Sequence, residues 1–241
     1  EELFVPLDDL AGLRAGRGDV QIDCSQKIVM PGLVNTHTHL GMHSLRGEND
    51  STELFDWLKA MEAKEKKLTS KHVKENTLAG LREAVRFGTT TVYDSYKFPE
   101  QRLEAFDKMG MRGILSSTVT DGKTFRESAA FLDSIKNRKG LVKGAIAANA
   151  VYSCPEEILA KVIEYSDANS LLRRIHAGET RKDRFDTLQK SGRLAIEYLD
   201  SIGFLSERCL LVHCIWITKG EIRKIAAAAD NAKRANDAVK I

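Results

Sequence analysis

Residues 29–40 read VMPGLVNTHTHL, and this stretch decides the fold. After Pro31 and Gly32 an apolar run leads to two histidines, His37 and His39, that are two residues apart. Residues i and i+2 of a β-strand point to the same side, so both imidazoles are expected on one face at the C-terminal end of a strand. Active sites of parallel barrels lie at that end of their strands. The stretch therefore predicts a histidine pair that can bind one divalent metal at the C-terminal end of a barrel's strands.

Outward from this stretch, short apolar or β-branched runs alternate with longer amphipathic segments. This alternation is typical of βα units around a parallel sheet and predicts an α/β fold. Gly88 is expected to end a helix at 70–87, and Pro155 to begin another at 156–167. Six barrel strands are predicted, at 33–37, 89–93, 113–119, 141–147, 171–176 and 209–213.

The predicted barrel is incomplete at its C-terminal end. A full (β/α)8 TIM-like barrel takes about 250 residues, whereas here six strands are used by residue 213 and the rest reads as mostly helical. The expected fold is such a barrel lacking its last two strands, over residues 31–241. Before it, the β-rich pieces at 20–22 and 27–29 predict that residues 1–30 are the remnant, or edge, of a small β-sandwich domain.

Composition excludes several classes of function. The chain has 37 Lys and Arg against 34 Asp and Glu, a formal charge of +3 without a long basic run, so no nucleic-acid partner is expected. No stretch approaches the roughly 20 apolar residues that span a bilayer, so no membrane association is expected. The cysteines lack a C-x-x-C pair and are predicted to be reduced thiols of a cytoplasmic protein. They are Cys24, Cys154, Cys209 and Cys214.

Four motifs in order, 29–40, GTTTVYD at 88–94, IHAGET at 175–180 and LVHC at 211–214, resemble those of the amidohydrolase superfamily. The resemblance covers about residues 19 to 225. It is to the branch that contains triazine hydrolases, chlorohydrolases and methylthioadenosine/S-adenosylhomocysteine deaminases. Such a resemblance implies a metal-dependent hydrolase barrel with one divalent metal, zinc by preference, with iron or manganese as alternatives.

The resemblance also implies roles for individual residues. His37, His39 and His176 would be the metal ligands, leaving a position open for water. Glu179, three residues after His176, matches the family's proton shuttle, and His213 matches the histidine that orients the attacking water. The implied reaction is hydrolytic deamination, or dechlorination, of a small aminated N-heterocycle by a metal-activated water. A homo-oligomer is a further expectation, because relatives of this kind are often dimers.

Two residues are candidates for substrate binding. Glu65 falls where nucleoside-deaminating relatives carry a substrate-binding glutamate, although its charge-rich surroundings favour a solvated helical face. Asn149 stands where the family shows a histidine, and an amide can donate a hydrogen bond but carries no charge. Asp94 is open between a loop cap and a functional role. His43 and His72 match no motif and are expected to be structural or exposed.

One family element is not found: the Gly-Thr-Asp of the eighth strand, since Asp230 and Asp237 lie in the helical tail. The chain is thus expected to be a fragment, or else a degenerate, non-catalytic metal-binding member. A third alternative is a binuclear cyclic-amide hydrolase, which needs a carboxylated lysine at the C-terminal end of the fourth strand. Lys143, six residues before Asn149, lies near the other end of that strand.

Overall fold

In the computed structural model of the chain, residues 16, 18, 20 and 22–238 are described, with side chains to residue 230. The chain divides into two compact units, Glu1–Pro31 and Gly32–Ile241. Residues 16, 18, 20 and 22–31 of the first unit form no strand, so the β-rich piece at 27–29 is not part of a sheet in the described residues. A strand needs a hydrogen-bonded neighbour, and the side chains of Ile28 and Val29 are exposed. Most residues of the predicted β-sandwich remnant lie outside the described part, and that assignment stays a prediction.

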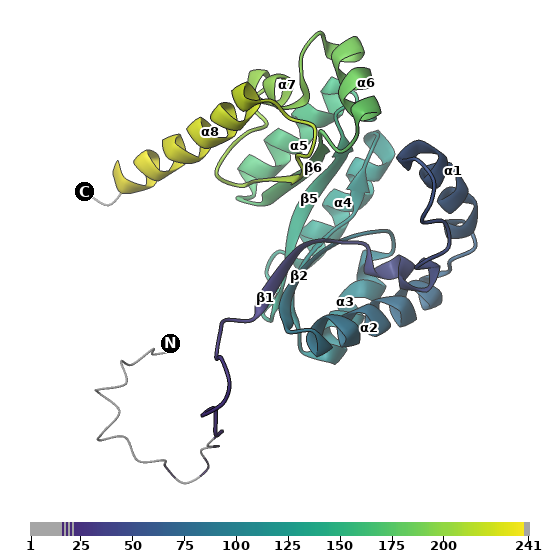
Figure 1. Cartoon of the computed structure of the whole chain (residues 1–241), viewed down its shortest axis with the longest axis vertical. Helices are drawn as coiled ribbons and strands as arrows, with labels where there is room; N and C mark the ends of the chain where they lie inside the picture. Colours follow the sequence, from purple (N-terminus) through teal and green to yellow (C-terminus); the bar gives the residue numbers. More distant parts are fainter. Residues whose placement is uncertain (1–15, 17, 19, 21, 239–241) are drawn as a thin grey trace. The chain divides into compact units, whose positions relative to one another are not determined.

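The second unit is built on one parallel sheet (Figure 1). Its strands, in spatial order, are β1 (Leu33–Thr38), β2 (Thr89–Ser95), β3 (Arg112–Ser116), β5 (Val142–Ala150), β6 (Leu172–Ala177) and β7 (Cys209–His213). The short β4 (Thr118–Val119) also pairs with β5. Since β3 and β4 both pair with β5 on either side of Ser117, together they make one barrel strand. The six predicted strands are therefore confirmed, and their order along the sheet follows the sequence.

Helices lie between successive strands and after β7. They are η2 (Leu40–Leu45), α1 (Leu54–Glu65), α2 (Ser70–Arg86), α3 (Pro99–Met109), α4 (Gly122–Ile135), α5 (Glu156–Ala168), α6 (Arg181–Ser191), α7 (Ala195–Ser201) and α8 (Lys219–Ala238). The predicted end of α2 is confirmed, because Gly88 has φ +85°, a conformation that glycine adopts without a Cβ clash. α2 and α3 lie side by side next to β1 and β2 (Figure 1).

The hydrophobic core lies between the sheet and this helical layer. Alternate strand residues, such as Val92, Leu115 and Ile175, are fully buried there. Their neighbours in sequence point into the barrel interior, which is polar along β6: Arg174 and His176 alternate with Arg173 and Ile175. This alternation is what brings the histidines of different strands to one place.

The sheet is nearly closed into a barrel but remains open between β1 and β7. Among the described strands, β1 pairs only with β2 and β7 pairs only with β6. Leu33 and Val34 on the free edge of β1 are exposed, at 49% and 62%. After β7 the described chain continues as α8, which includes Asp230. The predicted fold, a TIM-like barrel without its last two strands, is therefore confirmed.

All four cysteines are free thiols, as predicted. Within the described residues, no helix is both long enough and apolar enough to cross a membrane.

Candidate metal and catalytic site

His37 lies near the end of β1 and His39 directly after it, with their Nε2 atoms 3.2 Å apart. Thr38, between them, points the other way and donates its hydroxyl to the carbonyl of Tyr93 at 2.9 Å. It also contacts the Asp94 carboxylate at 3.1 Å, and the same oxygen accepts the N–H of Leu40 at 2.7 Å. Asp94 therefore holds the turn that follows β1, rather than capping its own loop.

Asp94 is in turn held by a buried arginine. The Arg102 guanidinium donates to the Asp94 carboxylate at 2.9 Å, and neither side chain is exposed to solvent. Arg102 also donates to the carbonyls of Asp94, Tyr96 and Ser116, so its donors are largely satisfied within the protein. An ion pair of this kind fixes the position of both partners, and with them the orientation of His37 and His39.

His176 on β6 completes a three-histidine group. Its Nε2 lies 3.3 Å from that of His37, and one ligand atom from each of the three residues lies within 4.8 Å of the others. His39 places Nδ1 2.6 Å from the carbonyl of Ser95, and His176 places Nδ1 2.7 Å from the carbonyl of Asn149. A carbonyl only accepts, so in both rings Nδ1 carries the proton and the Nε2 lone pair is directed at the site.

These imidazoles are held in the neutral form that metal ligation requires. Burial is the main reason that the pKa of His37 falls to about 3 and that of His176 to about 2. The positive charge of Arg174 is the second cause in both cases. Burial also lowers the pKa of His39. Three neutral imidazoles, two of them with the Nε2 lone pair fixed by the hydrogen bond of Nδ1–H, fit a divalent metal ion.

Glu179 and His213 lie beside the three-histidine group. Glu179 Oε1 is 3.4 Å from His213 Nε2, and the His213 ring stacks on His176 with centroids 5.4 Å apart. Burial raises the pKa of Glu179, and the neighbouring Asp183 raises it further. His213 has φ +73°, a left-handed conformation that is unfavourable for a residue with a Cβ and that often marks functional positions.

One pocket of about 450 Å³ brings together every residue that the sequence singled out for the site. Those residues are His37, His39, Glu65, Asn149, His176, Glu179 and His213. Glu65 does not lie on a fully solvated face: it is half-buried at the end of α1 and accepts the Tyr96 hydroxyl at 2.6 Å. Asn149 donates its side-chain amide to Ser153 at 2.8 Å.

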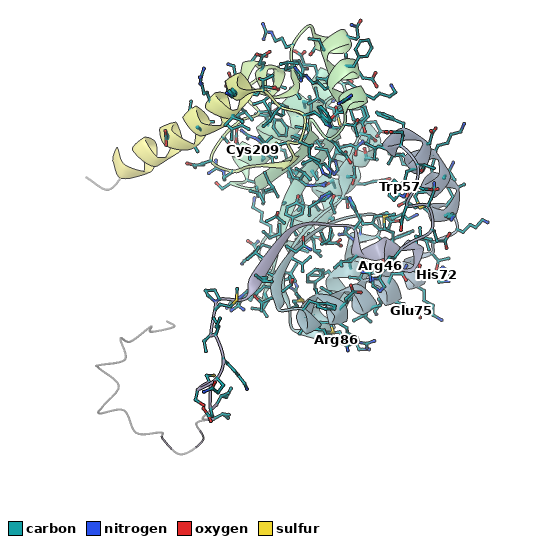
Figure 2. All side chains as sticks on the ribbon, viewed as in Figure 1. Arg46, Trp57, His72, Glu75, Arg86 and Cys209 are labelled. Carbon is teal, nitrogen blue, oxygen red and sulfur yellow. The ribbon has the colours of Figure 1, made fainter. Side chains whose placement is uncertain are left out.

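Other lining residues were not found from the sequence. Trp57 and Met61 on α1, and Tyr96 and Tyr152 in loops, supply an apolar and aromatic wall; Trp57 is labelled in Figure 2. No motif marks them, because helices and loops place them. Arg174 was also missed, although its position two residues before His176 on one strand puts both side chains on the same face.

The two remaining histidines lie outside this pocket, as predicted. His72, labelled in Figure 2, is exposed and forms reciprocal hydrogen bonds with Thr69 at the start of α2. His43 lies 3.8 Å from Glu83.

A parallel barrel with histidines and a carboxylate gathered at the C-terminal ends of β1, β6 and β7 defines the class of metal-dependent barrel hydrolases. The chain belongs to the Amidohydrolase family, whose sequence profile matches residues 28–239.

Named relatives are nucleoside deaminases. The chain is 36% identical over 212 residues to a 5'-deoxyadenosine deaminase of Methanothrix thermoacetophila, covering 86% of this chain and 51% of the relative. It is 32% identical over 219 residues to a 5-methylthioadenosine/S-adenosylhomocysteine deaminase of Pyrococcus furiosus, covering 87% and 52%. A solved adenosine deaminase from Xanthomonas campestris with bound zinc superposes with a TM-score of 0.78 at 26% identity, covering 83% and 48%. The chain thus spans about half the length of these relatives.

Proposed function

We propose that this chain carries the catalytic site of a metal-dependent hydrolase that deaminates a small aminated N-heterocycle, with a purine nucleoside as the preferred class. One observation carries the proposal: three neutral, oriented histidines and the Glu179–His213 pair converge in a single pocket. His37, His39 and His176 are the proposed ligands. Zinc is the proposed metal, because three imidazoles suit this borderline ion, with iron or manganese as alternatives.

A bound divalent ion would supply an activated water for attack on an electrophilic ring carbon. Glu179 is the proposed proton-transfer group, because its raised pKa suits a side chain that must both take up and release a proton near neutral pH. Glu179 would take one proton from the water and give it to a ring nitrogen, and would then carry the second proton of the water to the amino group, which leaves as ammonia. His213, 3.4 Å from Glu179, orients the water and steadies the charge that develops on its oxygen.

The rest of the pocket supports a nucleoside as substrate. The rings of Trp57, Tyr96 and Tyr152 offer faces on which a planar heterocycle can stack. Glu65 is the acidic side chain of α1 in this pocket, and its carboxylate can accept hydrogen bonds from sugar hydroxyls. Asn149 is the proposed donor to a ring or exocyclic atom. Relatives named as nucleoside deaminases agree with this assignment.

The test is metal analysis followed by ammonia release. The full chain is supplemented with zinc, iron or manganese, metal content is measured, and turnover is followed with adenosine, 5'-deoxyadenosine, methylthioadenosine and guanine. We expect about one metal per chain, and Glu179→Gln should reduce turnover by about 10²–10⁴-fold while leaving metal content unchanged. Glu127→Gln, on the exposed face of α4, is the control. A metal content below about 0.1 ion per chain after supplementation would refute the proposal.

The alternatives give different results in the same assay. Metal uptake without turnover of any substrate would favour a non-catalytic metal-binding protein, and chloride release from a chlorinated triazine would favour dechlorination. A binuclear cyclic-amide hydrolase predicts two metals per chain. The structure offers it little support, since Lys143 lines a separate pocket with Ile114 and Leu172. A homo-oligomeric state and a cytoplasmic location stay predictions.

A further inference from the structure

Arg174 is a buried cation inside the barrel, and nothing in the proposed reaction uses it. It is not exposed to solvent, and it lies on β6 on the same face as His176. Arg173, its neighbour on the other face, is paired with Asp167 at 2.6 Å and donates to the carbonyl of Phe204. For Arg174, by contrast, Nε and Nη1 have no hydrogen-bond partner, and no carboxylate among the described residues forms an ion pair with it.

Its remaining nitrogen, Nη2, contacts Nε2 of His176. The Nδ1–H of that ring donates to the carbonyl of Asn149, so Nε2 is the atom with the free lone pair. A guanidinium has donors only and stays protonated, so it can engage this nitrogen only as a donor to the lone pair. A metal ligated by His176 needs the same lone pair.

The charge of Arg174 acts on the whole group of histidines. Its guanidinium contacts the ring of His176, whose Nε2 lies 3.3 Å from that of His37, and a ligand atom of His39 lies within 4.8 Å of both. A fixed positive charge this close to the three ligand nitrogens disfavours a divalent cation between them, because like charges repel. The Tyr93 ring, with its centroid 5.8 Å from Arg174, supplies no negative charge: burial raises the pKa of Tyr93 to about 12, and its hydroxyl donates to Ser116.

We infer that Arg174 competes with the divalent metal for His176 and thereby sets the metal affinity of the three-histidine site. The inference rests on the proposed function for the identity of the ligands. It makes Arg174 a positioning residue that does not touch substrate. Metal binding would require the guanidinium to move away from Nε2, and the affinity would be lower than three oriented imidazoles alone provide.

The experiment measures zinc affinity of the full chain by competition with a chromophoric chelator at pH 7.5. Arg174→Met removes the charge and the donors while keeping an unbranched apolar stem. We expect it to bind zinc at least about 10-fold more tightly than the wild type, within the 10–100-fold range typical of residues that contact metal ligands. Arg112→Met, which removes the same charge from an exposed position on β3, should change the affinity by less than about 2-fold.

Two further variants keep the result interpretable. Arg174→Lys retains the charge but not the planar fork, and should lie between wild type and Arg174→Met. Arg174→Met removes an unpaired buried charge and should therefore raise the urea midpoint of the metal-free chain. If Arg174→Met does not fold, Arg174→Gln replaces it in the zinc measurement.

Each outcome separates the two proposals. Tighter zinc binding by Arg174→Met, with Arg112→Met unchanged, supports the competition. If the wild type binds zinc and Arg174→Met binds it with equal or weaker affinity, the role of Arg174 is overturned and the proposed function stands. If neither the wild type nor the variants bind a metal, the three-histidine site itself is refuted and both proposals fall.

Discussion

The substitution Asp94→Asn tests whether the buried ion pair behind β1 holds the histidine turn in place. The carboxylate accepts from the Thr38 hydroxyl, the Leu40 N–H and the Arg102 guanidinium. An asparagine oxygen can replace the acceptor for Leu40, but its NH₂ group then faces the donors of Arg102. The variant therefore leaves a fully buried guanidinium without its counter-charge.

Removing one partner of a buried pair costs about 3–5 kcal/mol. We expect the lower end, about 3 kcal/mol, because Arg102 keeps its bonds to the carbonyls of Asp94, Tyr96 and Ser116. Against a typical total stability of about 5–15 kcal/mol, this is a large loss. Zinc affinity should fall as well, because the turn that carries His37 and His39 loses its anchor.

The assay is urea unfolding of the metal-free chain, followed by zinc competition. The control is Asp107→Asn, which breaks an ion pair of Asp107 with Arg138 whose side chains are 43% and 28% exposed; it should cost at most about 1 kcal/mol. The double variant Asp94→Leu with Arg102→Met should regain stability, because an apolar pair can replace a buried ion pair, yet keep weak zinc binding. A loss below about 1 kcal/mol for Asp94→Asn would show that the pair does not hold the turn.

Three further predictions follow from the site. The pKa values of His37 and His176 in the folded chain are about 3 and 2, below the usual 6.5, so between these values the unfolded chain binds more protons than the folded chain. The stability of the metal-free chain, measured as the urea midpoint, should therefore be full above pH 6.5 and decline as the pH falls toward 3. His37→Asn should flatten this decline. Glu65→Gln should raise KM for a nucleoside by about 10-fold and leave KM for the free base unchanged. The control Glu62→Gln, on the exposed face of α1, should change neither KM value. An equal effect of Glu65→Gln on both substrates would show that Glu65 does not recognise the sugar. Zinc at 100 times its Kd should stabilise the chain by about 2.7 kcal/mol in urea unfolding, and His39→Asn should abolish the shift, so a shift retained by that variant would contradict the ligand assignment.

Strands were predictable where an apolar run and the residues that bound it determine their positions. The apolar runs of β1, β2 and β7 are bounded by residues that end helices or strands, such as Gly88, and their positions agree with the structure. The break at Ser117 was not predictable, because pairing with β5 determines where β3 ends and β4 begins. The β-rich piece at 27–29 forms no strand, because apolar and β-branched residues also need a pairing partner to make one.

The predicted site residues share a short-range signal, since each lies at or just after a strand end within a recognisable motif. What the motifs do not carry is the environment of those residues. The contact of Glu65 with Tyr96 joins the end of α1 to the loop after β2, and charge content alone favoured solvent exposure there. Arg174 belongs to a strand whose pattern of two adjacent arginines does not reveal which one is paired, and only the three-dimensional structure shows that Arg173 is and Arg174 is not.

Two histidines of the site come from the two free edges of the sheet. His37 lies on β1 and His213 at the end of β7, strands that do not pair with each other, yet their ring centroids are 4.8 Å apart. Sheet curvature brings them together, because the twist of successive parallel strands turns the two edges toward each other. The geometry of the cluster therefore depends on every strand between the edges as well as on the loops that carry the ligands. This dependence explains why contacts that tie an edge to its neighbours matter to the chemistry: Asp94 and Arg102 fix β1 against β2 and α3, and a metal shared by His37 and His176 would join β1 directly to β6.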